Sequence, residues 1–284
     1  MYIMKLIKTF VFLIVMSFSM LLNAGENPSF KVDVVGHGTP VLLFPGFACT
    51  GDVWNDLVED LSKTNQCHIF TFAGFGDVAP IEKPWLPKVK EGVARYISDK
   101  HLEESIIIGH SLGGSLGLWL ATDPDAKFKK VIVVDALPSI GALMMPNFKS
   151  ENVKYDNPYN RQSLEMNAQA FGTMATQMAK GMTSKEDKQV LIKDWILKAD
   201  RATYVYGYTD LMKLDLREPI AAIKVPVTIL AATEPYGQEN AKKNYNTQYM
   251  NLDNYTIKYA KGSAHFIMYD QPEWFLNQIK TELE

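Results

Sequence analysis

Short apolar runs bounded by glycine, proline and aspartate recur along the chain, and amphipathic stretches separate most of them. Runs of this kind are typical of buried strands, whereas apolar residues at three- and four-residue spacing indicate helices. The predicted strands cover 30–35, 41–44, 68–72, 105–108, 130–134, 227–231 and 255–259. The predicted helices outside the long central interval cover 54–62, 88–100, 112–121 and 272–283.

The alternation of strands and helices predicts an α/β fold. Such a pattern favours a mostly parallel sheet with helices on both faces. The first two predicted strands are separated only by Gly36-His37-Gly38. A turn this short predicts that those two strands form an antiparallel hairpin.

One long interval interrupts the alternation. Between 138 and 223 no run resembles a strand, and helical patterns cover 162–181, 185–198 and 203–213. Because a long unstructured loop is unusual in a compact domain, we expect an inserted helical lid over 139–222. The core domain would then comprise 25–138 and 223–284, with the lid over the carboxyl edge of the sheet, where α/β folds bind ligands.

Methionines recur on one face of the first predicted lid helix. Met166, Met174 and Met178 follow the helical repeat, and Met144 and Met145 stand at the start of the insertion. This apolar face is explained either by packing against the sheet or by a deformable pocket for an acyl group, since Met fills irregular shapes.

The N-terminus resembles an export signal. Lys5 and Lys8 precede an uncharged stretch over 9–24, which is too short to span a bilayer as a helix. A basic start, a short apolar centre and a small residue at Ala24 are typical of a secretory signal. We therefore predict a signal peptide at 1–24, a periplasmic or secreted mature protein, and no stable membrane insertion after cleavage.

Composition excludes several classes of protein. The 284 residues are 47% hydrophobic and 21% charged, which excludes disorder. A net charge of −3 without a basic run gives no surface for nucleic acid. Cys49 and Cys67 fall at opposite ends of neighbouring predicted strands, too far apart for a disulfide, so two free thiols are expected. Scattered histidines and cysteines predict no metal site, and no cofactor is predicted.

The most specific chemical motif is Gly109-His110-Ser111-Leu112-Gly113. It lies between the strand at 105–108 and the small-residue helix at 112–121. A serine on a sharp turn from strand to helix, flanked by glycines, is the context that a nucleophile elbow requires. Ser111 is therefore the predicted nucleophile. A serine hydroxyl also needs a base to take its proton.

Two further segments extend this motif into a family resemblance. Phe44-Pro45-Gly46-Phe47 follows an apolar strand, and His265 stands between the last strand and the last helix. With the elbow, these features resemble the α/β-hydrolase family over 30–284. The resemblance implies that His265 is the catalytic base and that the backbone N–H groups of Phe47 and Leu112 form the oxyanion hole. Leu112 also begins a helix, where unpaired N–H groups favour an anion.

The acid of the expected triad has two candidates. The usual family position follows the strand at 227–231, but that loop contains Glu234 and Pro235 and no aspartate. Asp135 ends the preceding strand, as the acid does in members such as the haloalkane dehalogenases. Both acids keep the chain order of nucleophile, acid and histidine. Asp135 is the preferred candidate and Glu234 the alternative.

These features together predict an exported serine hydrolase that cleaves small-molecule carboxylic esters through an acyl-enzyme intermediate. The absence of a basic cluster favours a neutral, moderately apolar ester. The same triad acting on lactone, amide or carbon–carbon bonds is the first alternative, and a non-catalytic ligand-binding protein of the same fold is the second. The sequence leaves the oligomeric state open.

Overall fold

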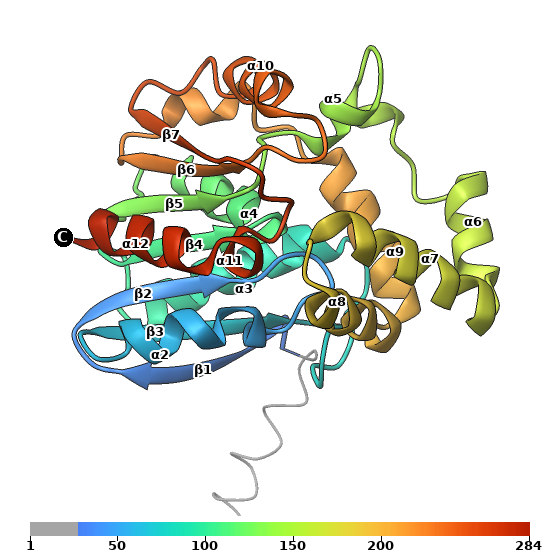
Figure 1. Ribbon diagram of the computed structural model, residues 1–284, viewed down its shortest axis with the longest axis horizontal. Coiled ribbons are helices and arrows are strands. Elements are labelled where there is room, and N and C mark those ends of the chain that lie inside the picture. The colour runs from blue at the N-terminus through green and yellow to red at the C-terminus, as the bar shows by residue number, and fades with distance from the viewer. Residues whose placement is uncertain (1–27) are drawn as a thin grey trace, which may run out of the picture.

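The computed structural model of the protein describes residues 28–284, and the predicted signal peptide at 1–24 lies outside them. A sheet of seven strands in the order β1-β3-β2-β4-β5-β6-β7 runs through the described part (Figure 1). Only β1 is antiparallel to its neighbour. The strands are β1 Phe30–Gly36, β2 Thr39–Phe44, β3 Asn65–Phe72, β4 Ile106–His110, β5 Lys130–Val134, β6 Val227–Ala232 and β7 Tyr255–Ala260.

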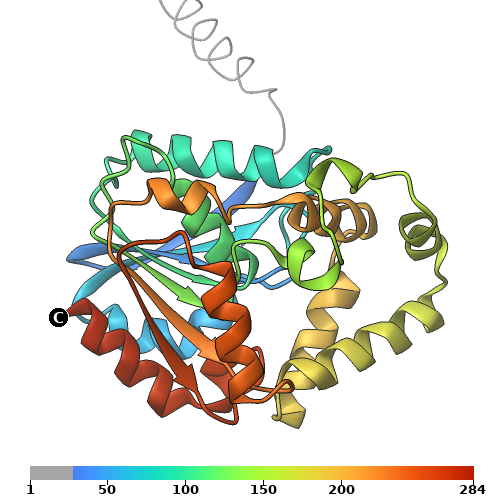
Figure 2. The same cartoon turned by 90° about the horizontal axis from the view of Figure 1, so that it is seen from above.

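Helices cover both faces of the sheet, as the alternation predicted. Seen from above, α3 lies on one side of the sheet and α2 and α12 lie on the other (Figure 2). The rings of Trp54 and Phe275 stack across the second of these layers. The helices of the core are α2 Asn55–Leu61, α3 Trp85–Asp99, α4 Leu112–Ala121, α10 Gln238–Gln248, α11 Ile267–Asp270 and α12 Pro272–Leu283, with a 3₁₀ turn at Gly51–Trp54.

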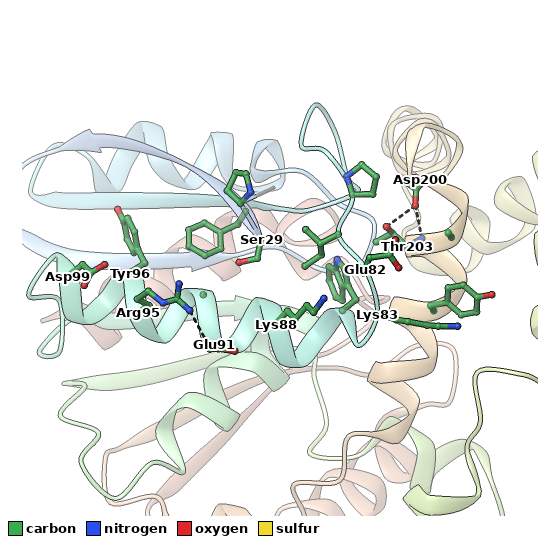
Figure 3. A pocket seen from close by; sticks show the side chains of 18 residues that line it. Ser29, Glu82, Lys83, Lys88, Glu91, Arg95, Tyr96, Asp99, Asp200 and Thr203 are labelled. Carbon is green, nitrogen blue, oxygen red and sulfur yellow. Dashed lines mark hydrogen bonds and ion pairs between the residues drawn. The ribbon is translucent and has the colours of Figure 1, made fainter. Parts of the chain in front are cut away.

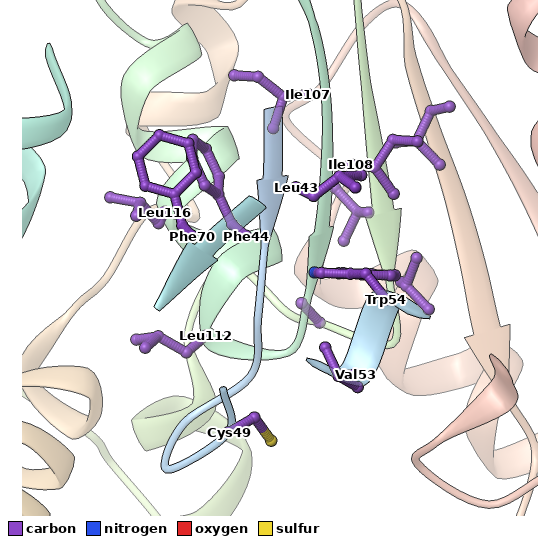
Figure 4. Close-up of a cluster of buried hydrophobic side chains, with 14 of the residues drawn as sticks. Leu43, Phe44, Cys49, Val53, Trp54, Phe70, Ile107, Ile108, Leu112 and Leu116 are labelled. Carbon is purple, nitrogen blue, oxygen red and sulfur yellow. The ribbon is translucent and has the colours of Figure 1, made fainter. Parts of the chain in front are cut away.

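The core lies on the two faces of the central strands. Leu43, Phe44 and Phe70 are completely buried, as are Ile107 and Ile108 (Figure 4). Because helices cover both faces, these strands are apolar at consecutive positions rather than at alternate ones. Burial of each such side chain contributes about 1.5–3 kcal/mol to folding. The resulting rigid sheet holds the loops at the carboxyl ends of β2, β4 and β5.

The predicted hairpin between the first two strands is wrong. β1 pairs with β3, which lies between β1 and β2. The glycines of the turn serve a different purpose, because the chain crosses closely over the start of β3. A Cβ on Gly36 would lie 2.3 Å from the carbonyl oxygen of Asn65, and one on Gly38 would lie 2.2 Å from that of Thr64. The two glycines therefore mark a backbone crossing and not the predicted hairpin turn.

The interval between β5 and β6 is helical, and within it the structure has no strand. The predicted helix at 162–181 is two helices, because Met166 leaves the helical conformation and the Asn167 side chain caps a new start. Figure 1 shows the helices α6 to α9 beyond one end of the sheet. The insertion contains α5 Ile140–Met144, α6 Pro158–Glu165, α7 Ala168–Met182, α8 Glu186–Lys198 and α9 Arg201–Lys213, with 3₁₀ turns at Ser150–Asn152 and Pro219–Ala222.

Two other expectations concern cysteine chemistry and membrane spans. Cys49 and Cys67 are free and buried. Burial raises the pKa of the Cys67 thiol to about 11, so this thiol is unreactive at neutral pH. Among residues 28–284 no helix is both long and apolar enough to cross a membrane.

Candidate active site

Ser111 occupies a sharp turn between β4 and α4. Its backbone has φ 53° and ψ −119°, a conformation that residues other than glycine rarely adopt. Two glycines make the turn possible, since a Cβ on Gly109 would lie 2.2 Å from the carbonyl oxygen of Gly113. A Cβ on Gly113 would in turn lie 2.2 Å from that of Phe44. The Ser111 N–H donates to Val134 on β5 at 2.9 Å, which fixes the turn against the sheet.

The loop after β2 lies directly beside this turn. A Cβ on Gly46 would lie only 2.7 Å from the Nδ1 of His110, the residue before Ser111, so a glycine lets the two segments approach closely. Within the described part of the chain, the N–H groups of Phe47 and Leu112 donate to no protein group. Leu112 is also the first residue of α4. Two free donors therefore flank the serine, as an oxyanion hole requires.

His265 and Asp135 meet at the carboxyl edge of the sheet. His265 precedes α11, and Asp135 follows β5 with φ 46°. The His265 Nδ1 lies 2.6 Å from the Asp135 Oδ2. The other oxygen of Asp135 accepts hydrogen bonds from the Ala232 N–H and the Tyr245 hydroxyl, both at 2.7 Å. The imidazole is thus held from one side, and its Nε2 is left for a second partner.

The carboxyl group of Asp135 is held in its charged form. Burial alone raises its pKa, but the hydrogen bonds and charge of His265, with the bonds from Tyr245 and Ala232, lower it below the ordinary value. Burial raises the pKa of the Tyr245 phenol well above its ordinary value, so Tyr245 remains a donor. Tyr245 lies on α10, whose polar sequence carried no signal for this role.

Of the two candidate acids, Asp135 is hydrogen-bonded to His265 and Glu234 is not. Glu234 is exposed on the loop after β6, and its backbone N–H donates to the carbonyl of Ser263 at 2.9 Å. The catalytic roles of Ser111, His265 and Asp135 stay predictions, but the geometry selects one acid.

His110 links the serine turn to the histidine loop. Its ring is completely buried and lies 4.6 Å, centroid to centroid, from the rings of both His265 and Phe266. Its Nε2 lies 3.1 Å from the backbone oxygen of His265. Burial, with a smaller contribution from His265, lowers the pKa of His110 to about 3. The neutral ring donates through Nε2, so the residue preceding Ser111 supports the backbone of His265.

Aromatic side chains of the insertion cover the loop after β2. The Phe47 ring lies 5.6 Å from those of both Tyr204 and Tyr208 on α9, and it also contacts Phe75 and Trp85. The Tyr204 hydroxyl lies 3.1 Å from the Met178 sulfur. Tyrosine side chains of the insertion therefore pack on the ring of Phe47, and Met178 contacts one of these tyrosines.

A separate groove of about 1170 Å³ lies between α3, the start of β1 and α9 (Figure 3). Its walls carry charges of both signs, and none of the proposed catalytic residues lines it. The labelled lining residues include Lys88, Glu91, Arg95, Asp99 and Asp200. Mixed charges on a wide opening identify no ligand class, and the predicted catalytic residues lie elsewhere, at the carboxyl edge of the sheet.

The comparison with known protein families decides the assignment. The model that describes the alpha/beta hydrolase family matches residues 41–278. The chain belongs to this family. The match includes the serine turn, Asp135 and His265. As an alpha/beta hydrolase, the chain is expected to use the elbow and the carboxyl edge of its sheet for chemistry.

Individual relatives include ester and lactone hydrolases. The chain is 25% identical to the pimeloyl-acyl-carrier-protein methyl ester esterase of Pseudoalteromonas atlantica over 212 residues, which cover 71% of this chain and 78% of the relative. It is 22% identical to 3-oxoadipate enol-lactonase 1 of Acinetobacter baylyi over 265 residues, which cover 91% of this chain and 94% of the relative.

Solved structures agree on the fold. The enol-lactonase of Burkholderia xenovorans superposes with a TM-score of 0.75 at 14% identity, covering 89% of this chain and 96% of that one. The esterase of Exiguobacterium antarcticum gives a TM-score of 0.74 at 15% identity, with 89% and 94% covered. Together the comparisons support a hydrolase of the esterase and lactonase type.

Proposed function

We propose that the protein is a serine hydrolase that cleaves neutral carboxylic esters through an acyl-enzyme intermediate. The observation that carries the proposal is the 2.6 Å hydrogen bond between Asp135 and His265, on a loop that adjoins the Ser111 turn through His110. The family match and the unpaired N–H groups of Phe47 and Leu112 support the same chemistry.

Each residue has a defined role in this mechanism. His265 takes the proton of the Ser111 hydroxyl as the oxygen attacks the ester carbonyl, and Asp135 stabilises the imidazolium that forms. The Phe47 and Leu112 N–H groups stabilise the negative charge on the carbonyl oxygen. His265 then donates its proton to the leaving alcohol. A water molecule activated by His265 attacks the acyl-enzyme and releases the acid and Ser111.

The insertion supports an apolar acyl group. Phe47, Tyr204 and Tyr208 contribute aromatic surface beside the proposed oxyanion hole, and the sulfur of Met178 contacts one of the two tyrosine hydroxyls. Met side chains adapt to irregular shapes, which suits a moderately apolar substrate. We propose that the insertion acts as a lid over the site and determines which acyl chains enter.

Export is the second part of the proposal. Lys5, Lys8 and the short apolar stretch that follows them support a cleaved signal and a periplasmic or secreted protein. Expression of the full chain with cell fractionation and N-terminal sequencing tests this. A mature N-terminus near Gly25 in the exported fraction is expected, and an intact Met1 in the cytoplasmic fraction would contradict it.

Covalent labelling tests the nucleophile. A fluorophosphonate probe should label the wild-type protein and should not label Ser111→Ala. Ser115→Ala is the matched control, because Ser115 is a buried serine on α4, the helix that follows Ser111, and its hydroxyl donates to the Leu137 carbonyl. Labelling of wild type and Ser115→Ala alone supports the proposal. An unlabelled wild type would favour a ligand-binding protein without catalysis.

Lactone hydrolysis is the second candidate. It is favoured by the 3-oxoadipate enol-lactonase, which aligns with 91% of the chain. Turnover of acyclic p-nitrophenyl esters, lactones of matched carbon number and the corresponding anilides separates ester, lactone and amide hydrolysis. A kcat/KM for lactones that exceeds the value for acyclic esters would replace the first candidate with the second.

A further inference from the structure

Asp270, the last residue of α11, accepts hydrogen bonds from two distant parts of the chain. Its Oδ1 accepts from the Thr183 hydroxyl at 2.7 Å and from the Ser184 N–H and hydroxyl at 2.9 Å each. Its Oδ2 accepts from the Ala264 N–H at 2.8 Å. Thr183 and Ser184 form the turn between α7 and α8 in the insertion, whereas Ala264 directly precedes His265.

A second hydrogen bond joins the same two segments. The Phe266 N–H donates to the carbonyl of Met182, the last residue of α7, at 3.0 Å. On one side of His265, Ala264 is therefore bonded to the Asp270 carboxylate, which also binds the α7–α8 turn. On the other side, Phe266 is bonded directly to the end of α7. His110 holds the backbone oxygen of His265 itself.

The chemistry of the carboxylate suits this position. Four donors converge on Asp270, and an ionised carboxylate offers acceptors only. Burial raises its pKa, but the bonds from Thr183, Ser184 and Ala264 lower it below the ordinary value. Asp270 touches neither Asp135 nor the imidazole in the described structure, so any effect on catalysis must act through the loop that carries His265.

We propose that Asp270 is a positioning residue that ties the helical insertion to the loop of His265, so that the base stands in place only while the α7–α8 turn is docked. This inference rests on the proposed function, because it assigns His265 as the base. It predicts that a change in the insertion, far along the sequence from the triad, alters the rate of the chemical step.

Asp270→Asn tests the link with almost no change in shape. An amide has one acceptor oxygen, so one orientation loses the bond from Ala264 and the other loses the bond from the Ser184 N–H. Either way a backbone N–H faces an NH₂ group. We expect kcat to fall about 10- to 100-fold with KM changed less than about twofold, because a small misplacement of the base affects the transition state more than substrate binding.

Glu282→Gln is the matched control. Glu282 also accepts from several side chains, namely Lys130, Lys258 and Thr228, but it lies on α12 at the other end of the strands. This variant should lose thermal stability while its kcat stays within about twofold of wild type. If Asp270→Asn shows the same behaviour as Glu282→Gln, the proposal is wrong and Asp270 is only structural.

Thr183→Val extends the test to the insertion side, since it keeps the shape and removes the hydroxyl that donates to Asp270 and accepts, at 3.3 Å, from the Lys185 N–H. It should reproduce part of the loss in kcat, and its effect should not add fully to that of Asp270→Asn in a double-mutant cycle. This variant keeps the proposal testable if Asp270→Asn does not fold. A kcat of Thr183→Val equal to that of wild type would contradict the link.

A spectroscopic measurement separates this inference from the proposed function. The downfield Nδ1–H resonance of His265 reports its hydrogen bond to Asp135 without requiring turnover. We expect Asp270→Asn and Thr183→Val to weaken or broaden it, with faster exchange of the Ala264 amide, and Glu282→Gln to leave both unchanged. If the fluorophosphonate probe does not label the wild type but the variants show these spectral changes, the hydrolase is refuted and the link is retained. If the probe labels the wild type but the variants show no spectral change, the link is refuted.

Discussion

At the scale of single residues, two of the five described non-glycine residues with positive φ belong to the proposed triad. Ser111 and Asp135 both have positive φ, at 53° and 46°, and each follows directly after a neighbouring parallel strand. Such conformations cost about 1–3 kcal/mol for residues other than glycine and persist where the surroundings enforce them. Here hydrogen bonds to Val134 and Leu230 enforce them. The positive φ at two neighbouring strand ends is consistent with the site proposed at this edge.

The choice of acid gives the first prediction. Asp135→Asn should lower kcat by about 10⁴-fold, because the amide no longer stabilises the imidazolium or fixes its tautomer. Glu234→Gln should leave kcat near the wild-type value, since Glu234 is exposed on its loop. Steady-state kinetics on one p-nitrophenyl ester compares the two variants. Similar small losses from both would remove Asp135 from the triad.

The buried imidazole of His110 gives a second prediction, which concerns pH. Below about pH 6.5 the unfolded chain binds a proton at this residue. The folded protein does not bind this proton until about pH 3, because burial and, to a smaller extent, His265 lower the pKa of His110. The charge of Asp135 raises this pKa but offsets only part of the decrease. Stability is therefore lost as the pH falls through this window, by up to about 1.4 kcal/mol per pH unit.

Replacing His110 with glutamine, which keeps a donor but does not titrate, should flatten this loss. Urea unfolding of wild type and His110→Gln at several pH values between 4 and 7 measures the two slopes. Parallel slopes would show that the imidazole titrates normally in the folded protein.

At this scale the sequence offered candidate site residues where they adjoin a recognisable turn. Ser111, His265 and the loop residue Phe47 stand in short motifs, and the structure brings their loops together at one edge. The acid could not be decided, because both candidates follow neighbouring strands and only the backbone conformation of Asp135 directs its carboxylate to His265. Tyr245 was missed because a tyrosine in a polar helix carries no local signal.

At the scale of elements, the contact between α4 and β2 leaves no room for a side chain at Gly113. A Cβ there would lie 2.2 Å from the Phe44 carbonyl oxygen, whereas one on Gly172 in α7 meets no atom within 4 Å. Gly113→Ala should therefore destabilise the protein by about 2 kcal/mol or more, because the helix must move away from the sheet.

Gly172→Ala is the matched control for this third prediction. It should stabilise the protein by about 0.5–1 kcal/mol, as expected for a glycine in a helix interior. Chemical denaturation gives both free energies of unfolding. Equal effects of the two substitutions would show that the close approach at α4 is not maintained in solution.

All seven strands were predicted from apolar runs, but the pairing of β1 with β3 was not. The length of an apolar run depends on burial, which is local, whereas pairing depends on the path of the chain. The glycines at 36 and 38 fit a hairpin and a backbone crossing equally well in sequence. The helix α10 was missed since its residues are mostly polar, and its few buried positions, such as Ala241 and Tyr245, are too sparse to define an apolar face.

At the scale of the whole molecule, the insertion is attached to the core at separate points. The Asp200 N–H donates to Gly74, and the Asp210 carboxylate accepts from the N–H groups of Trp85 and Leu86 at 2.6 and 3.1 Å. Asp210 also accepts from the Tyr155 hydroxyl. With Asp270 these contacts lie on different sides of the insertion, which predicts that insertion and core unfold together.

A single unfolding transition is the fourth prediction. Tryptophan fluorescence, which includes Trp195 in the insertion and Trp54 in the core, should give the same midpoint as far-UV circular dichroism. Asp210→Ala should lower the free energy of unfolding by about 2–4 kcal/mol, because it leaves backbone donors buried without a partner. Asp200→Ala, which removes a helix cap, should cost only about 1 kcal/mol. Separate midpoints would mean that the insertion folds independently.

The position of Glu282 bears on how the protein can be attached to a support. Glu282, near the C-terminus, binds Lys130 and Thr228 at the amino ends of β5 and β6. The last helix therefore ends at the amino edge of the sheet, whereas Ser111 lies at the carboxyl edge. Figure 1 shows the C-terminus across the molecule from the insertion. A tether placed after Glu284 would therefore orient an immobilised molecule with the proposed active site toward the solution, whereas trimming the final three residues would remove the Glu282 contacts that set this orientation.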